Sequence, residues 1–211
     1  MIPTALVLAV LLPTLLWLSV VGDPRLYVDP SVPSGQLAYV LSKLAGLCAL
    51  GLFALQLTLM VLRGTALEPA AGRWGKPAHR RLGLSVVALI VAHVALFIAA
   101  ASLRSDHLAT HLLLPRFESG FYDAMVSLGV LALYVVLVLV FAGALAWRRA
   151  GRQSRPRGAH RLLALASVPL IAFHSYAIGS ETSTLPVMAF YALLGAVALV
   201  GLWRTYRGAR R

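Results

Sequence analysis

Four histidines lie in two apolar segments of this sequence, and imidazole is a side chain that binds transition metals and haem iron. One segment, HRRLGLSVVALIVAH, runs from His79 to His93, and the other, HRLLALASVPLIAFH, runs from His160 to His174. The histidines of each pair are fourteen residues apart. That step returns to nearly the same face of a helix, roughly 21 Å along its axis. The spacing therefore predicts two helices that each present imidazole at two depths.

The number of ligands favours haem over a bare ion. A pair of imidazoles fills both axial positions of a haem, but it supplies too few ligands for tetrahedral zinc. No Cys, Asp or Glu lies near these histidines in the sequence to complete a metal shell. A lone histidine in a bilayer is sometimes only a structural hydrogen-bond partner, whereas two pairs at one spacing favour ligands.

Composition assigns the chain to a lipid bilayer. Of its 211 residues, 60% are hydrophobic and only 12% are charged, which is too few charges for a soluble domain. The net charge of +12 would suit nucleic acid, but the basic residues fall in short loops between apolar runs, so we expect no nucleic-acid partner. The single cysteine, Cys48, excludes an internal disulfide and is expected to be a small buried side chain.

The sequence predicts an all-α integral membrane protein, a six-helix transmembrane bundle formed by one domain over residues 1–211. The predicted spans are about 3–21, 37–62, 79–101, 121–147, 160–178 and 185–203. The first run has no basic residues before it and is long enough to span, so we interpret it as a helix rather than a cleaved signal. Gly46 and Gly51 are expected to permit close helix approach. Ser183 or Thr184 is expected to cap the sixth helix.

The distribution of basic residues predicts the orientation. Three arginines fall in the loops of one side, with Lys43 just inside the second span, and fifteen of the 19 basic residues fall on the other side. Because cytoplasmic loops are enriched in Lys and Arg, both termini are predicted to be cytoplasmic, in a plasma (inner) membrane. The fifteen are Arg63, Arg73, Lys76, Arg80, Arg81, Arg148, Arg149, Arg152, Arg155, Arg157, Arg161, Arg204, Arg207, Arg210 and Arg211.

This orientation gives the histidines two levels. His79 and His160 lie at the cytoplasmic ends of the third and fifth helices, and His93 and His174 lie deeper, toward the outer side. Because the two helices run in the same direction, we expect one haem to be clamped between helices 3 and 5 at each level.

Three arginines follow the inner histidines directly, namely Arg80, Arg81 and Arg161. Guanidinium groups there are suited to pair with the propionates of an inner haem. The positive-inside distribution alone explains them equally well.

The two histidine-bounded runs, in the third and fifth of six helices, resemble the ferric-reductase-like transmembrane domain family. That family includes NADPH oxidases, metalloreductases and the haem-binding membrane subunit of the periplasmic protein-methionine-sulfoxide reductase system, which is closest in size. The resemblance covers the whole chain as topology, and its specific part is the four histidines with the RRLG run. It implies that His79 and His160 ligate an inner haem b, and that His93 and His174 ligate an outer one.

The resemblance implies a cytochrome that moves electrons from a cytoplasmic donor to an acceptor outside, as the electron-transfer haem subunit of an oxidoreductase. NADPH oxidases and metalloreductases continue into a flavin and nicotinamide domain, whereas this chain stops eight residues after its predicted sixth helix. The expected donor is therefore a separate cytoplasmic flavoprotein, bound flavin (FMN) or a membrane quinol. The expected acceptor is a periplasmic or extracellular redox partner. His79 departs from the methionine-sulfoxide reductase subunit, in which this histidine varies.

Other polar residues near the outer side have two interpretations each. His107 and His111, beside Asp106, are four residues apart and could hold a metal ion, but they lack further ligands, which favours solvated loop histidines. Ser175, Tyr176 and Ser180 could contact an outer cofactor or quinone, or could satisfy backbone groups at a helix end.

Two other functions fit parts of the pattern. A quinol-linked cytochrome b subunit usually spreads its ligands over other helices, and an assembly subunit of a larger redox complex is a related possibility. A transporter that uses histidine as a proton relay would predict acidic residues inside the spans. None of the seven acids lies in the middle of one.

Overall fold

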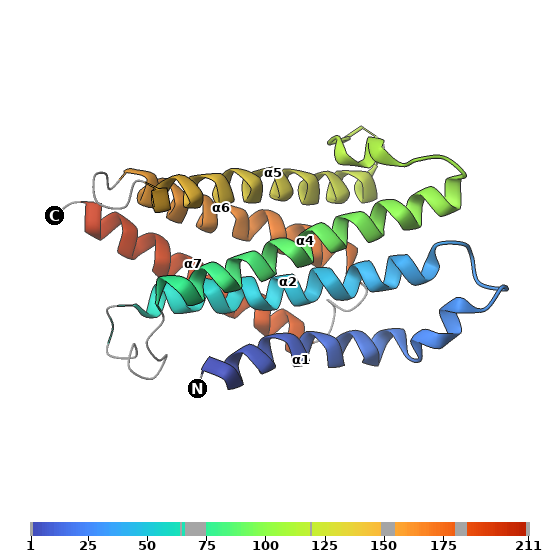
Figure 1. Ribbon diagram of the computed structural model, residues 1–211, viewed down its shortest axis with the longest axis horizontal. Coiled ribbons are helices and arrows are strands. Elements are labelled where there is room, and N and C mark those ends of the chain that lie inside the picture. The colour runs from blue at the N-terminus through green and yellow to red at the C-terminus, as the bar shows by residue number, and fades with distance from the viewer. Residues whose placement is uncertain are drawn as a thin grey trace. The chain divides into compact units, whose positions relative to one another are not determined.

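The computed structural model describes residues 2–63, 65, 75–118, 120–148, 155–179 and 185–209. Within these ranges the regular structure is helical and contains no strand. Six helices are long and apolar enough to cross a membrane, which confirms the six predicted spans. They are α1 (Ile2–Val21), α2 (Gln36–Leu62), α4 (Lys76–Ser105), α5 (Phe121–Arg148), α6 (Arg155–Ile178) and α7 (Leu185–Ala209), shown in Figure 1.

The helices extend beyond the apolar runs that predicted them, mainly at basic ends. α6 begins at Arg155 instead of residue 160, and α7 continues to Ala209 instead of residue 203. Hydropathy marks only the part of a helix that suits lipid, whereas Lys and Arg are good helix formers and continue the helix outward. The predicted capping residues of the sixth helix, Ser183 and Thr184, lie outside the described residues.

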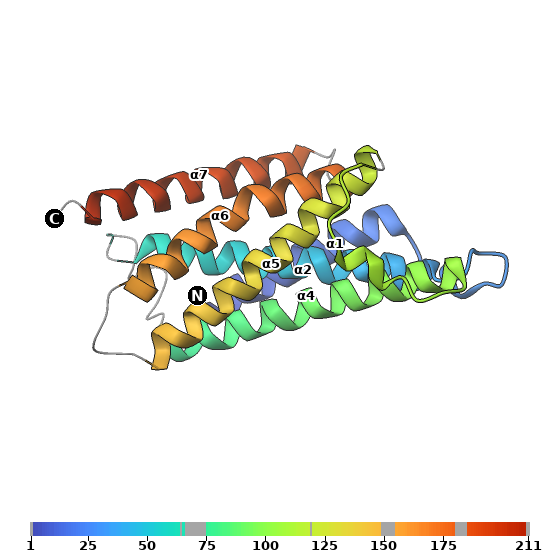
Figure 2. The ribbon, with the colours of Figure 1, turned by 90° about the horizontal axis from the view of Figure 1, so that it is seen from above.

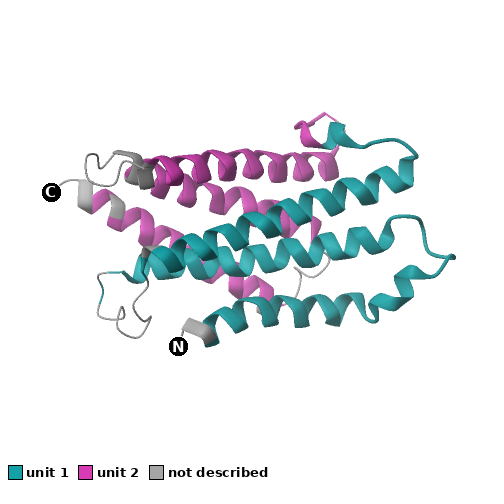
Figure 3. Cartoon of the chain, in the orientation of Figure 1, with its two compact units in different colours: residues 1–112 teal, residues 113–211 magenta. Residues whose placement is uncertain are grey.

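The chain forms two compact units, residues 1–112 and residues 113–211, coloured separately in Figure 3. Each unit contains three of the six helices and one of the two histidine-bearing helices. The prediction that all 211 residues act as one domain stays a prediction.

In the first unit, α2 lies between α1 and α4 (Figure 1). The indole N–H of Trp17, which is 3% exposed, donates to the backbone oxygen of Val40 at 2.7 Å. Gly51 lies directly against the backbone of α1, where an added Cβ would overlap the carbonyl oxygen of Ala9. The close approach predicted at Gly51 is therefore confirmed, and it fixes α1 on α2.

Replacement of Gly51 by alanine is expected to destabilise the first unit by about 1–3 kcal/mol, because the methyl group must push α1 away from α2. The expected result is a lower midpoint of thermal unfolding in detergent. Gly195→Ala is the matched control, since a Cβ at Gly195 would meet no atom of the described residues within 4 Å. Alanine is the better helix former, so the control should be neutral or stabilising. Equal midpoints for the two variants would contradict this packing.

In the second unit, α6 lies between α5 and α7 (Figure 2). The hydroxyl of Ser127 on α5, 2% exposed, accepts from the backbone N–H of Arg116 at 2.6 Å and donates to the backbone oxygen of Arg116 at 2.9 Å. The Tyr134 hydroxyl on the same helix donates to the backbone oxygen of Leu113. These bonds fasten the segment that precedes α5 to the side of that helix.

Candidate functional site

The four histidines occupy two continuous helices, as their spacing predicts. His79 and His93 belong to α4, and His160 and His174 belong to α6. All four lie within candidate membrane spans and are partly buried.

Three of the four imidazoles bond to the neighbouring helix of their own unit in the same way. In each, Nδ1 lies within hydrogen-bond distance of a backbone carbonyl oxygen. The pairs are His93 with Ser42 of α2 at 2.8 Å, His160 with Leu139 of α5 at 3.0 Å, and His174 with Met125 of α5 at 2.8 Å.

This contact fixes the tautomer of the neutral ring. A carbonyl oxygen only accepts, so Nδ1 must carry the hydrogen and donate it. Nε2 of the same neutral ring then carries no hydrogen and has the lone pair with which imidazole coordinates a metal. A ligating histidine usually donates its other ring N–H to a carbonyl or carboxylate, which orients the ring and raises its basicity. Three histidines thus have the hydrogen-bond pattern of metal ligands.

A glycine of the neighbouring helix lies against each of these three rings. It is always four positions after the residue whose backbone carbonyl accepts from the ring. An added Cβ would come within 3.0 Å of the ring at Gly46, 2.5 Å at Gly129 and 3.0 Å at Gly143. Gly46 faces His93, Gly129 faces His174 and Gly143 faces His160. We call each such pair, a carbonyl and the glycine four residues later, a carbonyl–glycine seat.

The seat has a simple cause in helix geometry. In an α-helix the carbonyl of residue i already bonds the N–H of residue i+4, and the side chain of residue i+4 stands beside that bond. Glycine leaves this place open, so a ring can approach the backbone and share the carbonyl.

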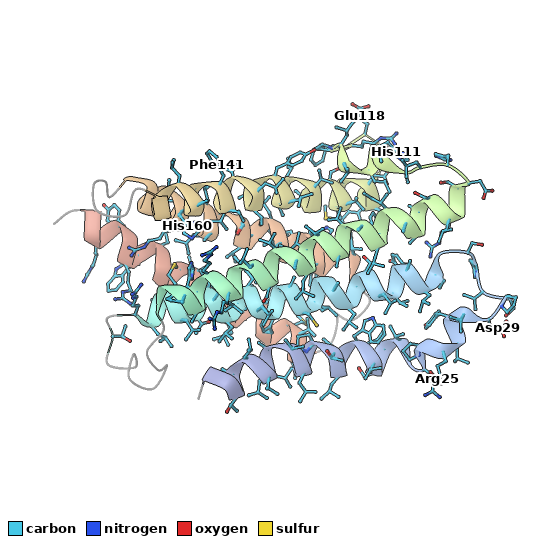
Figure 4. The ribbon with its side chains drawn as sticks, in the orientation of Figure 1. Arg25, Asp29, His111, Glu118, Phe141 and His160 are labelled. Carbon is cyan, nitrogen blue, oxygen red and sulfur yellow. The ribbon has the colours of Figure 1, made fainter. Side chains whose placement is uncertain are left out.

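The two faces of α5 differ at the level of His160. His160 lies on the side of α6 that contacts α5 and bonds to Leu139 there, whereas Phe141, two residues after Leu139, points away from this contact and is 68% exposed (Figure 4).

The seats repeat at the same interval as the histidines. Met125 and Leu139 are fourteen residues apart, as are Gly129 and Gly143, which matches His160 and His174 on the antiparallel helix α6. The close approach predicted at Gly46 is confirmed by its contact with His93, whereas the two glycines of α5 were not predicted to have a role. The sequence signal that could have identified them is their separation of fourteen residues, which equals the separation of His160 and His174.

His79 is held differently. Its partner is the side chain of Gln56 on α2, whose Nε2 lies 3.0 Å from Nδ1 and 3.3 Å from Nε2 of the ring. Gln56 is fourteen residues after Ser42, so it occupies the register position where a fourth seat would begin.

The three arginines proposed for propionates, Arg80, Arg81 and Arg161, are exposed at the basic ends of α4 and α6. That exposure agrees with either interpretation of these residues. Lys43, inside α2, lies with its Nζ 5.3 Å from the centre of the Tyr39 ring, and the guanidinium of Arg104 lies 5.1 Å from the same ring. Tyr39 thus contacts two cations of the first unit.

The two histidines that follow α4 form a stacked pair. The rings of His107 and His111 have centroids 6.1 Å apart, and Nδ1 of His107 lies 2.7 Å from the backbone oxygen of Ser105. Among the described residues, no group of three or more His, Cys, Asp or Glu side chains could hold a metal ion.

Ser175 and Tyr191 form a short hydrogen-bond chain beside His174. The Tyr191 hydroxyl donates to the Ser175 hydroxyl at 2.6 Å, and Ser175 donates to the backbone oxygen of Ile171 at 2.7 Å. The ring of Tyr176 packs edge-on against Tyr191. The Ser175 bond to Ile171 lies inside α6, with Ile171 seven residues before the helix ends at Ile178, so it does not satisfy a helix-end group and both interpretations of Ser175 stay predictions. Ser180 lies outside the described residues.

Comparisons with protein-family models, with curated proteins and with solved structures found no match to this chain.

Proposed function

We propose that this protein is a membrane-embedded b-type cytochrome that carries electrons across the bilayer. The donor is a cytoplasmic flavin- or NAD(P)H-linked protein or a quinol, and the acceptor lies on the outer side as a methionine-sulfoxide reductase partner, ferric iron or oxygen. The protein would be the electron-transfer haem subunit of an oxidoreductase. The observation that carries the proposal is the shared hydrogen-bond pattern of His93, His160 and His174.

The donor set fits haem b. In the proposal, His79 and His160 are the axial ligands of an inner haem, and His93 and His174 those of an outer one. This pairing rests on the matched fourteen-residue spacing and on the resemblance to ferric-reductase-like domains. Bound haem would supply one-electron redox chemistry at its iron.

The chain itself holds and orients the ligands. The carbonyls of Ser42, Met125 and Leu139 keep Nδ1 protonated, which leaves Nε2 without a hydrogen and able to bind a metal. The residues that surround the histidines in α4 and α6 are mostly apolar, which excludes water and lowers the local dielectric constant. Two levels of ligands divide a barrier of roughly 30 Å into shorter steps.

The proposed orientation places both termini in the cytoplasm. It rests on the fifteen Lys and Arg residues of one side and on the even number of candidate spans. Arg80, Arg81 and Arg161 would then be near the inner haem, where they are suited to pair with its propionates.

Electron transfer across lipid is the direct test of this function. Vesicles are loaded with ferricyanide, dithionite is added outside, and the loss of ferricyanide absorbance is followed. Vesicles that contain the haem-loaded protein are expected to lose it faster than protein-free vesicles and faster than vesicles given free haem. Haem-loaded protein that leaves the rate at the level of these controls would contradict the function.

A further inference from the structure

Among the described contacts, one of the four proposed ligands differs from the other three. His93, His160 and His174 each donate to a backbone carbonyl beside a glycine, whereas His79 contacts the amide of Gln56. In the register of α2, Gln56 corresponds to Ser42, and Met60 corresponds to Gly46. The fourth position therefore has a side-chain amide in place of an open carbonyl, and methionine in place of glycine.

We infer that Gln56 is the positioning residue of His79, and that its amide does for this ligand what a backbone carbonyl does for the other three. The inference rests on the proposed function, since it treats His79 as a haem ligand.

The surroundings of Gln56 support this role. The side chain is partly buried in the inner half of an apolar span, where an amide is costly without hydrogen-bond partners. It extends across to α4, because a Cβ added at Gly83 would lie 3.4 Å from its Nε2 and 3.8 Å from its Oε1. Gly83 is four residues after His79 on the same helix, α4, and leaves room for the amide of Gln56. At the other three histidines the glycine is on the neighbouring helix instead.

The chemistry requires the amide to present its oxygen. When Nε2 of His79 is the ligand, Nδ1 carries hydrogen and needs an acceptor. The oxygen and nitrogen of a glutamine amide have nearly the same shape, so rotation of the amide by half a turn puts Oε1 where Nε2 now lies, 3.0 Å from Nδ1. A backbone carbonyl cannot rotate in this way. In the contacts described for the four ligands, His79 therefore differs in having a partner that can turn from donor to acceptor.

Three variants separate the acceptor from the amide as a whole. Gln56→Leu removes the acceptor, and retention of the inner haem is expected to weaken by about 10–100-fold. Loss of a residue that hydrogen-bonds to a metal-ligating histidine typically has an effect of this size. Gln56→Glu keeps an acceptor, so haem should be retained, with a more negative midpoint potential at one haem only. The double variant Gln56→Leu with Met60→Gly opens the carbonyl of residue 56 in the manner of the other seats, and it is expected to restore haem retention.

The readouts are haem per chain, the two midpoint potentials and the low-spin ferric EPR signals. Thr58→Ala is the matched control, because Thr58 is a polar, partly buried residue of the same helix that donates to its own backbone at Ala54. It should leave all three readouts unchanged.

Two results would overturn the inference. One is full haem content with unchanged potentials and EPR signals in Gln56→Leu. The other is a double variant that folds, as judged by its unfolding midpoint, but retains no more haem than Gln56→Leu. If the wild-type protein itself binds no haem, the proposed function fails, which is a different outcome from either.

Discussion

Replacement of His93 or His174 by alanine is expected to remove the outer haem and to stop electron transfer across the membrane. Each residue supplies one of the two axial ligands in the proposed outer pair, and no Cys, Asp or Glu lies near it in the sequence to take its place. Haem content should fall from two per chain to one. The ferricyanide assay in vesicles should fall to the rate of protein-free vesicles.

The loop histidines provide the control for this pair of variants. His107→Ala and His111→Ala remove imidazoles that are exposed and outside the helices of the proposed ligands. Both variants should keep two haems and the full transfer rate. A His174→Ala protein that retains its haem and its transfer rate would show that the ligand assignment is wrong.

Replacement of Gly129 by alanine is expected to have nearly as large an effect, although Gly129 carries no side chain. Its Cβ would lie 2.5 Å from Cε1 of His174, so the ring must move off the carbonyl of Met125. We expect retention of the outer haem to weaken by about 10–100-fold. This is the typical effect of losing a group that hydrogen-bonds to a metal-ligating histidine. Haem content after dilution or dialysis measures this loss.

Gly195→Ala is again the matched control. It adds the same methyl group to α7 of the same unit, at a place with no atom of the described part of the chain within 4 Å. This variant should keep its haem and the wild-type unfolding midpoint. If Gly129→Ala retained haem as firmly as Gly195→Ala, the carbonyl–glycine seat would have no role in ligand binding.

The membrane spans could be predicted from the sequence because lipid imposes a strong condition. A chain in hydrocarbon must satisfy its backbone internally, so each crossing is a long apolar helix that composition alone reveals. The ends of α4, α6 and α7 could not be predicted as well, since a helix can continue into water without an apolar signal.

The histidines could be predicted for a similar reason, because an ionisable residue in an apolar span stands out and the interval between His79 and His93 is repeated between His160 and His174. The residues that hold them do not stand out. Gly129 and Gly143 resemble any small residue in an apolar helix until the antiparallel register of α5 and α6 identifies what they face. Gln56 is a single amide with no period, and only its contact with His79 gives it a role.

The binding of two haems by these four histidines is tested most directly on the purified protein. Its reduced-minus-oxidised absorption spectrum is recorded, and its haem is extracted and counted per chain. We predict a low-spin b-type spectrum and two haems per chain. One haem per chain would contradict the role of His79. A protein that contains no haem after expression with sufficient haem would contradict the cytochrome itself.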